Sequence, residues 1–516
     1  MMFGQKYANE ILARLEKESN PRVLVYVDPD IDGVVAARLI MAFLDERGIS
    51  YQWYCNTNRA HGFFLKEDDL HAYLGKDLRG AYILHGDFTT TESQIEWLVG
   101  LGINILSTDH HELSEGQQLI VKKDDEGVVR GVVINNQYEF ENPARRYQSG
   151  TGIILTVLRD YTGKRWGGLA AEQLVGWTLL SDVRDISGSE AKWWLSKLFS
   201  WNYNEPVSLK EGSLDRVLRH VVDAVMANRR DWEFGVIKTN RTFVDFTLSP
   251  AINALFRFDK EKDAVKVFLG GAYPAYRGIN GRNWQEYQRK VRDAILAEAD
   301  VTKYGEHFAV LDLKWPYKNA ILTECEASNF IGLAASQLMD QDKCCVIAIA
   351  RDIGGEVRRA SFRGMYNLPY RENLVEKGLL NGAGHSAAFG IPDMPKEVDM
   401  LGISQVVNNL VDNFLRSGKS DKKVMPVENL AIFDKNYGAK IAEINDYAPE
   451  ADKIYLEYVG QGIEIKKSSP RRVLFSIDGK DVLYFGADGD ETTVSSGIIN
   501  VSKGRVGVDY TLRKGE

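Results

Sequence analysis

Short apolar segments alternate with amphipathic helical segments through the first third of the chain. Residues 23–28 predict a buried strand, and the apolar positions between Gly33 and Gly48 predict the helix that follows it. The pattern recurs, with strands predicted at 81–85, 103–107 and 132–135 and helices at 92–98 and from Gly150 onward. Strands that alternate with helices form a mostly parallel sheet with helices on both faces. The sequence therefore predicts an α/β fold.

The middle of the chain continues this character. Helices are predicted at 170–182 and 214–227, and the long charged segment 283–299, free of Gly and Pro, predicts a helix that joins two lobes. Strands at 308–313 and 345–350 mark a second, smaller α/β region.

The C-terminal region differs from the rest. Residues 416–423 are polar and basic, and with Pro426 they predict a linker. From Lys453 onward, Tyr and Val alternate with polar residues and are interrupted at 478–479 and 487–489, which predicts hairpins of a small β domain. A chain of 516 residues has room for several domains. The predicted boundaries are 1–190, 191–300, 301–415 and 427–516.

Composition excludes several classes of protein. With 64 Lys and Arg against 72 Asp and Glu, the net charge of −8 provides no global attraction for nucleic acid, so any polyanion must be bound locally. No apolar run is long enough to span a bilayer and the first residues show no secretory signal, so we expect a cytoplasmic protein without a membrane partner. The four cysteines have neither disulfide-framework nor zinc-site spacing.

An acidic motif follows the first predicted strand. Asp28, Asp30 and Asp32 occupy alternate positions directly before Gly33 and the helix. Three neighbouring anions repel one another unless cations lie among them, and hard or borderline divalent ions fit carboxylate ligands. The alternative is a solvated acidic turn.

A second motif, Asp109-His110-His111, follows another predicted strand. Two further acids, Asp87 after the strand 81–85 and Asp182 in an apolar helical segment, are weak signals individually. In a parallel sheet, however, side chains that follow adjacent strands gather at one edge. Carboxylates and imidazoles suffice together for two divalent ions, which can activate water and stabilise the attacking and leaving oxygens of a phosphate ester. Mixed His and Asp ligation suits Mn²⁺. The residues thus point to phosphoester hydrolysis.

The second α/β region contains possible phosphate contacts. Residues 381–386 (NGAGHS) form a glycine loop that presents His385, and glycines let backbone N–H groups approach a phosphate. Arg363 offers a guanidinium suited to a bidentate contact with phosphate. The alternative is a turn with an incidental surface histidine.

These motifs, in this order, resemble those of the DHH phosphoesterase superfamily, which is named for the triplet found here at 109–111. Within it, the sequence is most similar to the RecJ-like single-strand-specific exonucleases. Residues 147–152 (YQSGTG) resemble the glycine loop of that branch, and 248–257 (LSPAINALFR) resemble its Pro-x-Ile/Leu-Asn-Ala segment ending in Arg. Asp28, with Tyr26 in place of the histidine found in oligoribonuclease-like members, also suits this branch.

The resemblance implies a DHH catalytic domain at 1–190, a helical extension with the connecting helix at 191–300, a DHH-associated substrate-binding domain at 301–415 and a β-rich, OB-like nucleic-acid-binding domain at 427–516. It implies an enzyme that uses Mn²⁺ or Mg²⁺, as two ions, to hydrolyse single-stranded DNA from 5′ to 3′ into 5′-mononucleotides in DNA repair, recombination or replication. Single-strand-binding or replication proteins are the implied protein partners.

The resemblance also assigns roles to residues. The metal ligands are expected to be Asp28, Asp30, Asp32, Asp87, Asp109, His110 and Asp182. The catalytic residues are expected to be Asp109 and His111. The substrate contacts are expected to be Ser149, Gly150, Arg257, Arg363, Gly382, Gly384 and His385.

Two other functions stay open. One is a DHH phosphodiesterase for small substrates, such as an oligoribonuclease or a cyclic-dinucleotide hydrolase. The other is a non-catalytic nucleic-acid-binding scaffold, against which the complete set of acidic residues argues.

Overall fold

A computed structural model of the chain describes most of its residues. They are residues 2, 4–57, 61–88, 90–111, 119–138, 148–163, 165–182, 186, 189–203, 213–226, 239, 241–274, 282–392, 394–395, 397–417, 423–427, 441–442, 444–446, 454–464, 467–469, 472–477, 480–485, 493–504 and 507–513. Contacts divide the chain into two units. The first comprises Met1–Asn253, Glu261–Tyr273 and Lys422–Glu516, and the second comprises Ala254–Lys260 and Pro274–Asp421.

The first unit contains the predicted α/β sheet. Its six strands are ordered β2-β1-β3-β4-β6-β5, and all neighbours are parallel except β5, which runs antiparallel to β6. The strands are β1 (Val23–Val27), β2 (Gln52–Cys55), β3 (Tyr82–Gly86), β4 (Asn104–Asp109), β5 (Val121–Lys123) and β6 (Val129–Asn135). The predicted α/β class is confirmed.

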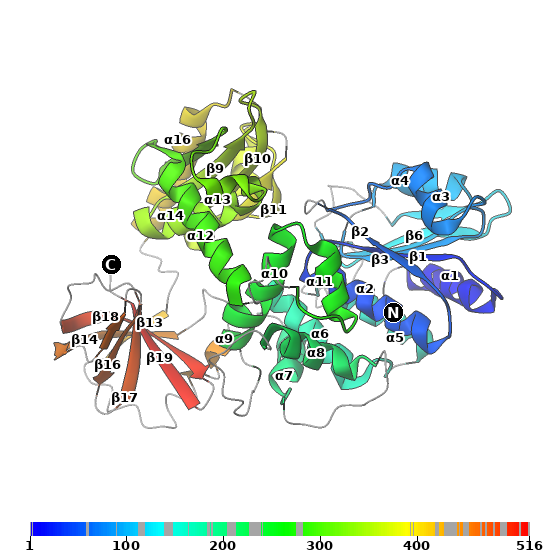
Figure 1. Cartoon of the computed structure of the whole chain (residues 1–516), viewed down its shortest axis with the longest axis horizontal. Helices are drawn as coiled ribbons and strands as arrows, with labels where there is room; N and C mark the ends of the chain where they lie inside the picture. Colours follow the sequence, from blue (N-terminus) through cyan, green and yellow to red (C-terminus); the bar gives the residue numbers. More distant parts are fainter. Residues whose placement is uncertain are drawn as a thin grey trace. The chain divides into compact units, whose positions relative to one another are not determined.

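Helices cover both faces of this sheet (Figure 1). One face carries α1 (Gln5–Lys17), α2 (Ile31–Glu46) and α5 (Gly150–Thr162). The other carries α3 (Glu67–Leu74) and α4 (Glu92–Gly100). Alternate strand residues such as Leu24, Tyr26 and Ile83 pack with α3 and α4 in one apolar core. The helix predicted to begin after Gly33 starts two residues earlier, at Ile31, because Asp30 caps it.

Further helices complete this unit. They are α6 (Gly168–Ser181), α7 (Ser189–Phe199), α8 (Asp215–Met226), α9 (Arg241–Phe243), the π-helical turn η2 (Val244–Leu248), the first part of α10 (Ser249–Arg257) and α11 (Glu261–Phe268). Asp182, predicted to lie within a helix, instead lies directly after α6, where the chain leaves the helical hydrogen-bonding pattern.

The second unit is built on another six-stranded sheet, ordered β11-β12-β10-β9-β8-β7. Only β8 and β9 are parallel, and the other neighbours are antiparallel. The strands are β7 (Asp300–Lys303), β8 (Phe308–Lys314), β9 (Cys345–Arg351), β10 (Val357–Arg363), β11 (Ala383–His385) and β12 (Ala388–Ile391).

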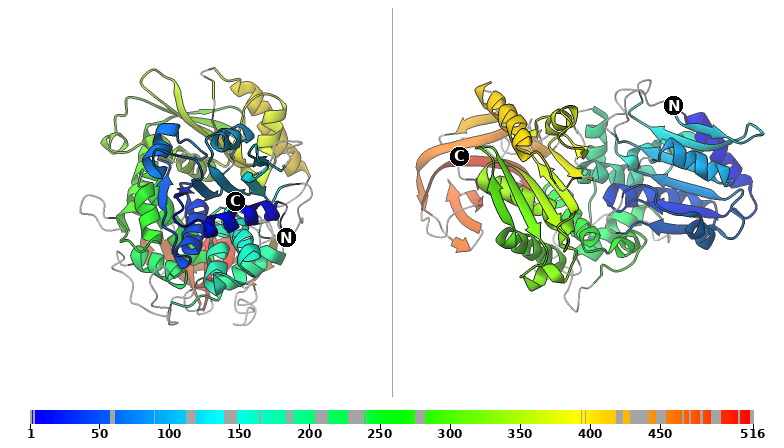
Figure 2. Two further views of the ribbon diagram at one scale, coloured as in Figure 1. Left: turned by 90° about the vertical axis from the view of Figure 1, so that its right-hand side faces the viewer. Right: turned by 90° about the horizontal axis from the view of Figure 1, so that it is seen from above.

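Helices lie on both sides of this second sheet (Figure 2). On one side α14 (Ile331–Asp342) contacts β9 and β10, and α12 (Arg282–Glu298), the predicted long helix, packs on α14. On the other side α16 (Met400–Arg416) contacts β8. The shorter helices are α13 (Ala320–Thr323), η3 (Ala327–Phe330), η4 (Met365–Asn367) and α15 (Tyr370–Glu376).

A third sheet, near the C-terminus, has seven strands in the order β13-β14-β18-β19-β17-β16-β15. They are β13 (Lys423–Val427), β14 (Ile454–Glu464), β15 (Lys467–Ser469), β16 (Arg472–Ile477), β17 (Lys480–Phe485), β18 (Thr493–Gly504) and β19 (Gly507–Arg513). The predicted β-rich region is therefore present, and its likeness to an OB fold stays a prediction. Most of the predicted linker, 418–422, lies outside the described residues.

The two predicted hairpins have different outcomes. The hairpin at 478–479 is confirmed, since β16 and β17 are antiparallel and Ile477 pairs with Lys480. The hairpin at 487–489 is wrong, because β17 pairs in parallel with β19 and β18 lies on the far side of β19. A glycine break predicts a change of direction but does not determine which strand becomes the neighbour.

Candidate metal centre

The acidic motifs lie where adjacent parallel strands end. Asp28 follows β1, Asp87 follows β3, and Asp109 is the last residue of β4. Because these three strands are neighbours in the sheet, their carboxyl ends bring the three aspartates to one edge. All three side chains are buried, with exposed fractions of 2 % or less.

The first acidic motif is fixed by two helix N-termini. Oδ1 of Asp30 accepts a hydrogen bond of 2.9 Å from the backbone N–H of Gly33 and caps α2. The carboxylate of Asp32 accepts from the backbone N–H groups of Gly150 (2.6 Å) and Thr151 (3.0 Å), the first residues of α5. These hydrogen bonds fix the orientation of both carboxylates at the two helix N-termini.

Two glycines permit the close approach of these segments. A Cβ atom on Gly33 would lie 2.4 Å from Cβ of Asp28, and one on Gly150 would lie 2.6 Å from Cβ of Asp87. Real atoms do not approach so closely, so any larger residue at either position must displace an aspartate. The glycines therefore set the spacing of the acidic cluster.

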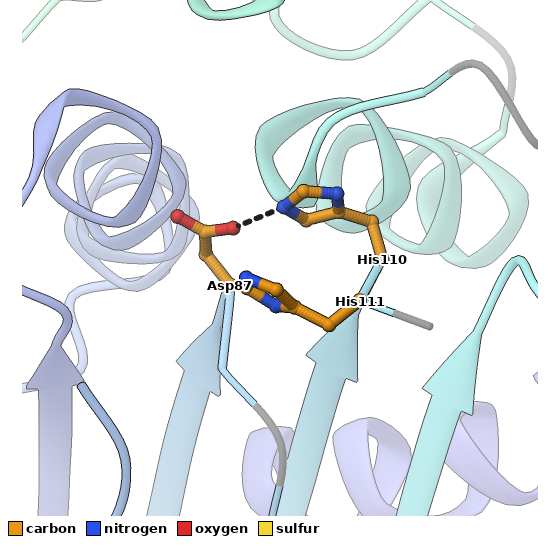
Figure 3. Close-up of side chains that lie close together, drawn as sticks. All are labelled: Asp87, His110 and His111. Atoms are coloured by element: carbon orange, nitrogen blue, oxygen red, sulfur yellow. Dashed lines mark ion pairs between the residues drawn. The ribbon is translucent and has the colours of Figure 1, made fainter. Parts of the chain in front are cut away.

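His110 lies at the centre of the carboxylates. Its Nε2 is 2.8 Å from Oδ1 of Asp87, 3.5 Å from Oδ2 of Asp182 and 3.8 Å from Oδ2 of Asp32. Figure 3 shows Asp87 and His110 pointing toward one another from the ends of neighbouring strands. Asp87 adopts a positive φ of 77°, an uncommon conformation for a residue with a side chain, and its N–H donates to the carbonyl of Thr108.

Asp109 mainly organises its own loop. Its Oδ1 accepts hydrogen bonds from the backbone N–H of His110 (2.8 Å) and of His111 (3.2 Å), and it lies 2.7 Å from Nδ1 of His111. Burial opposes the charged form of His111, but the neighbouring Asp109 outweighs it and raises the pKa of His111 to about 9. Half of the His111 side chain is exposed.

His61 is a candidate that sequence reasoning missed. Its Nδ1 lies 2.5 Å from Oδ2 of Asp28. It follows β2, an edge strand beside β1, so it reaches the same edge of the sheet as the acidic motifs. An isolated histidine carries no motif, and only a correct prediction of β2 and its neighbour could have revealed it.

Three groups among the described residues each offer three ligand atoms within 4.8 Å of one another. The groups are Asp87 with His110 and His111, Asp32 with His110 and Asp182, and Asp28 with Asp30 and His61. Asp109 belongs to none of these groups, so its predicted role as a ligand stays a prediction.

The electrostatics of the cluster favour a cation. Burial raises the pKa of Asp28 to about 6, although His61 opposes the shift. Burial, then repulsion from Asp32, Asp30, Asp182 and Asp28, raises the pKa of Asp87 well above its usual range. Oδ1 of Asp28 is buried and accepts no hydrogen bond from any described residue. Clustered carboxylate oxygens and imidazole nitrogens are ligands that fit divalent ions such as Mn²⁺ or Mg²⁺.

The predicted substrate contacts lie in both units. In the first, the buried hydroxyl of Ser149 caps α5 by accepting from the N–H of Gly152 and lies 2.8 Å from Oγ1 of Thr178. Gly150, beside Asp87, begins α5. Ser149 and Gly150 therefore have structural roles, in capping α5 and in allowing Asp87 to lie close to it. Their contact with substrate stays a prediction.

In the second unit, Nη1 of Arg257 donates to Oε1 of Gln288, and Nη1 of Arg363 donates to Oγ of Ser361 and to the carbonyl of Phe362. Gly382 directly precedes β11, which contains Gly384 and His385. The side chain of His385 lies outside the part of the chain that the structure describes.

Comparison with known proteins identifies the fold. No protein-family model matches the sequence, and no curated protein matches it. Among solved structures, RecJ from Thermus thermophilus in complex with Mn²⁺ aligns over 100 % of this chain and 72 % of its own length, with 16 % identity and a TM-score of 0.61. The complex of that protein with Mg²⁺ aligns over 99 % of this chain and 70 % of its own, with 15 % identity and a TM-score of 0.52. At fold level, the predicted likeness to RecJ is confirmed.

None of the described helices combines the length and apolar character needed to cross a membrane.

Proposed function

We propose that the chain is a metal-dependent phosphodiesterase that degrades single-stranded DNA from the 5′ end to 5′-mononucleotides, in DNA repair, recombination or replication. The observation that carries this proposal is the convergence of three buried or half-buried carboxylates on Nε2 of His110. The RecJ fold supports the same class of activity, and the RecJ structures contain Mn²⁺ or Mg²⁺.

The metal ligands in this proposal are Asp28, Asp30, Asp32, Asp87, Asp109, His110 and Asp182, shared between two ions. All of them except Asp109 belong to the groups of close ligand atoms described above. When bound, such ions lower the pKa of water and neutralise charge on the phosphate. The protein supplies a fixed, mostly buried arrangement of oxygen and nitrogen atoms. The helix caps at Asp30 and Asp32 keep those atoms in place before the substrate arrives.

His111 is the proposed residue for direct contact with the phosphate. Asp109 holds its Nδ1, while the half-exposed ring can present Nε2 to substrate. Asp109 therefore acts in orienting this histidine as well as the loop. The positive charge favoured on His111 suits a negatively charged phosphate.

The second unit supplies the remaining substrate contacts in this proposal. Arg257, Arg363 and His385 bind phosphate groups, and Gly382 and Gly384 let the backbone approach them. Arg363 is already oriented by its bonds to Ser361 and Phe362, which reduces the entropy lost on binding. The C-terminal sheet is assigned the binding of longer strands, by analogy with OB folds.

The test is digestion of long single-stranded DNA labelled separately at each end, with Mn²⁺ and with EDTA. Duplex DNA of the same sequence and a dinucleotide are digested in parallel. The proposal expects Mn²⁺-dependent release of mononucleotides from the 5′ end of the single strand only. Cleavage of the dinucleotide alone would establish a small-substrate phosphodiesterase instead. DNA binding without hydrolysis of any substrate would indicate the scaffold role.

A further inference from the structure

The segment 61–65 (HGFFL) follows β2, which ends at Cys55, and presents one exposed aromatic ring three residues after His61 of the candidate metal centre. Phe63 and Leu65 are buried, with exposed fractions of 5 % and 6 %, whereas Phe64 between them is 58 % exposed. Among the described Phe and Trp residues, Phe64 has the most exposed side chain. Its neighbours thus anchor the segment in the core and turn this ring outward.

Hydrogen bonds fix the backbone at Phe64 and at Gly62, two residues before it. The N–H of Phe64 donates to Oη of the buried Tyr26 over 3.0 Å. Tyr26 in turn donates to Oδ1 of Asn56 (2.6 Å), and Nδ2 of Asn56 donates to the carbonyl of Gly62 (2.7 Å). Tyr26 belongs to β1, the strand that leads into the acidic motif. The position of Phe64 is therefore coupled to the strand that positions Asp28.

The ring of Phe64 lies close to the preceding residues of the segment. A Cβ atom on Gly62 would be 3.5 Å from Cε2 of Phe64, so the ring folds back over Gly62. The residue next to Gly62 is His61, whose Nδ1 contacts Asp28. An isolated exposed apolar residue is ordinary on a protein surface. An exposed ring on an anchored backbone, close in sequence to a candidate metal ligand group, is a pre-formed contact surface.

We propose that Phe64 is a stacking platform for the nucleobase of the nucleotide whose phosphate lies at the metal centre. This inference rests on the proposed function and specifies its substrate class: the substrate carries a base and is not an inorganic or base-free phosphate compound. Stacking on an aromatic ring tolerates every base, because each base has a π-face. Phe64 therefore favours nucleotides without selecting a sequence, as a degradative nuclease requires.

The experiment measures binding of two compounds to the full chain by calorimetry in the presence of Mn²⁺. The probes are deoxyadenosine 5′-monophosphate and 2-deoxyribose 5-phosphate, which share sugar and phosphate and differ only in the base. Wild-type protein is expected to bind the nucleotide about tenfold more tightly than the base-free compound. Phe64→Ala is expected to weaken nucleotide binding about tenfold and leave binding of deoxyribose phosphate unchanged. Phe64→Trp is expected to retain the nucleotide affinity of the wild type, because its side chain is also aromatic.

Trp193→Ala is the matched control, since Trp193 is an exposed aromatic residue on α7 with an exposed fraction of 42 %. It should bind both probes as wild type does. Equal affinity of the wild type for the two probes, or an equal loss of both in Phe64→Ala, would overturn the inference. Base-dependent binding that needs Phe64, in a protein that hydrolyses no phosphodiester, would support the platform and reject the proposed activity. Hydrolysis of phosphodiesters by a protein that binds the two probes equally would reject the stacking platform and leave the proposed activity standing.

Discussion

Nε2 of His110 lies 2.8 Å from Oδ1 of Asp87, and both side chains are 2 % exposed. The contact joins the ends of β3 and β4, so it shows that the residues after these neighbouring strands come together at one edge of the sheet. Asp87 also has a φ of 77°, a region that Asn adopts more readily than most residues with side chains. Asn can therefore replace Asp87 and remove the charge without new backbone strain.

Asp87→Asn is expected to reduce phosphodiesterase activity by about 100-fold or more, because a charged ligand is lost. The metal-free variant should unfold at the same temperature as wild type or higher, since burial and neighbouring carboxylates already disfavour the charged form of Asp87. Thermal unfolding in EDTA and Mn²⁺ titration by calorimetry test both parts. Undiminished Mn²⁺ affinity would contradict the assignment.

Asp109→Ala and Asp182→Ala should differ in stability. Both are expected to abolish hydrolysis. Asp109→Ala removes an acceptor of two backbone hydrogen bonds at a fully buried position, which costs about 1–3 kcal/mol for an unsatisfied buried group, whereas the side chain of Asp182 is 21 % exposed. Urea unfolding of the metal-free variants measures the difference. An Asp182→Ala protein that retains metal-dependent activity would remove Asp182 from the centre.

Gly150→Ala is expected to displace Asp87, because the added Cβ would lie 2.6 Å from Cβ and 2.7 Å from Oδ1 of that residue. We expect a loss of about 1–3 kcal/mol in stability from the steric conflict, together with weaker Mn²⁺ binding. Gly100→Ala is the matched control, since no atom lies within 4 Å of its added Cβ and it ends helix α4. That change should leave metal binding unaffected. Equal effects of the two substitutions would argue against a steric role for Gly150.

Metal-free stability should fall as pH rises from about 4 to about 6, because burial raises the pKa of Asp28 from 3.8 to about 6. In that range the folded carboxyl holds more protons than the unfolded one, so deprotonation favours unfolding. Mn²⁺ should therefore raise the melting temperature more at pH 7.5 than at pH 5. Melting curves in EDTA and in Mn²⁺ check this. Asp28→Asn should flatten the metal-free profile, and a profile as steep as wild type would contradict the cause given.

Local patterns were sufficient to predict the strands that carry the site. The apolar runs that became β1, β3 and β4 are buried on both faces, so each produces a clear signal of its own. The convergence of Asp28, Asp87 and Asp109 then followed from parallel topology. Helix α1 was missed although Ala8, Ile11, Leu12 and Leu15 have helical spacing and are buried, so that signal was present in the sequence.

Other features depend on contacts that the local sequence does not encode. Only the last residue of β2 is buried, so this edge strand has a weak pattern, and without it His61 could not be placed beside Asp28. The hairpin predicted at 487–489 is wrong for a related reason. The strand that pairs with β17 is β19, and the strand next in sequence, β18, lies on the far side of β19. Pairing between distant segments is determined by the whole sheet.

The hydrogen bonds from Gly150 and Thr151 to Asp32 span 118 and 119 residues of sequence. During synthesis, the acidic motif near residue 30 emerges long before the helix that orients it, and Asp182, a proposed metal ligand, emerges later still. A nascent chain of fewer than 150 residues lacks that orientation. Contacts between such distant residues form slowly, because the chain loses entropy when the long loop closes and the contact stabilises the fold only afterwards. Acquisition of high metal affinity is therefore a late event, and it can serve as a kinetic reporter for completed folding of this domain.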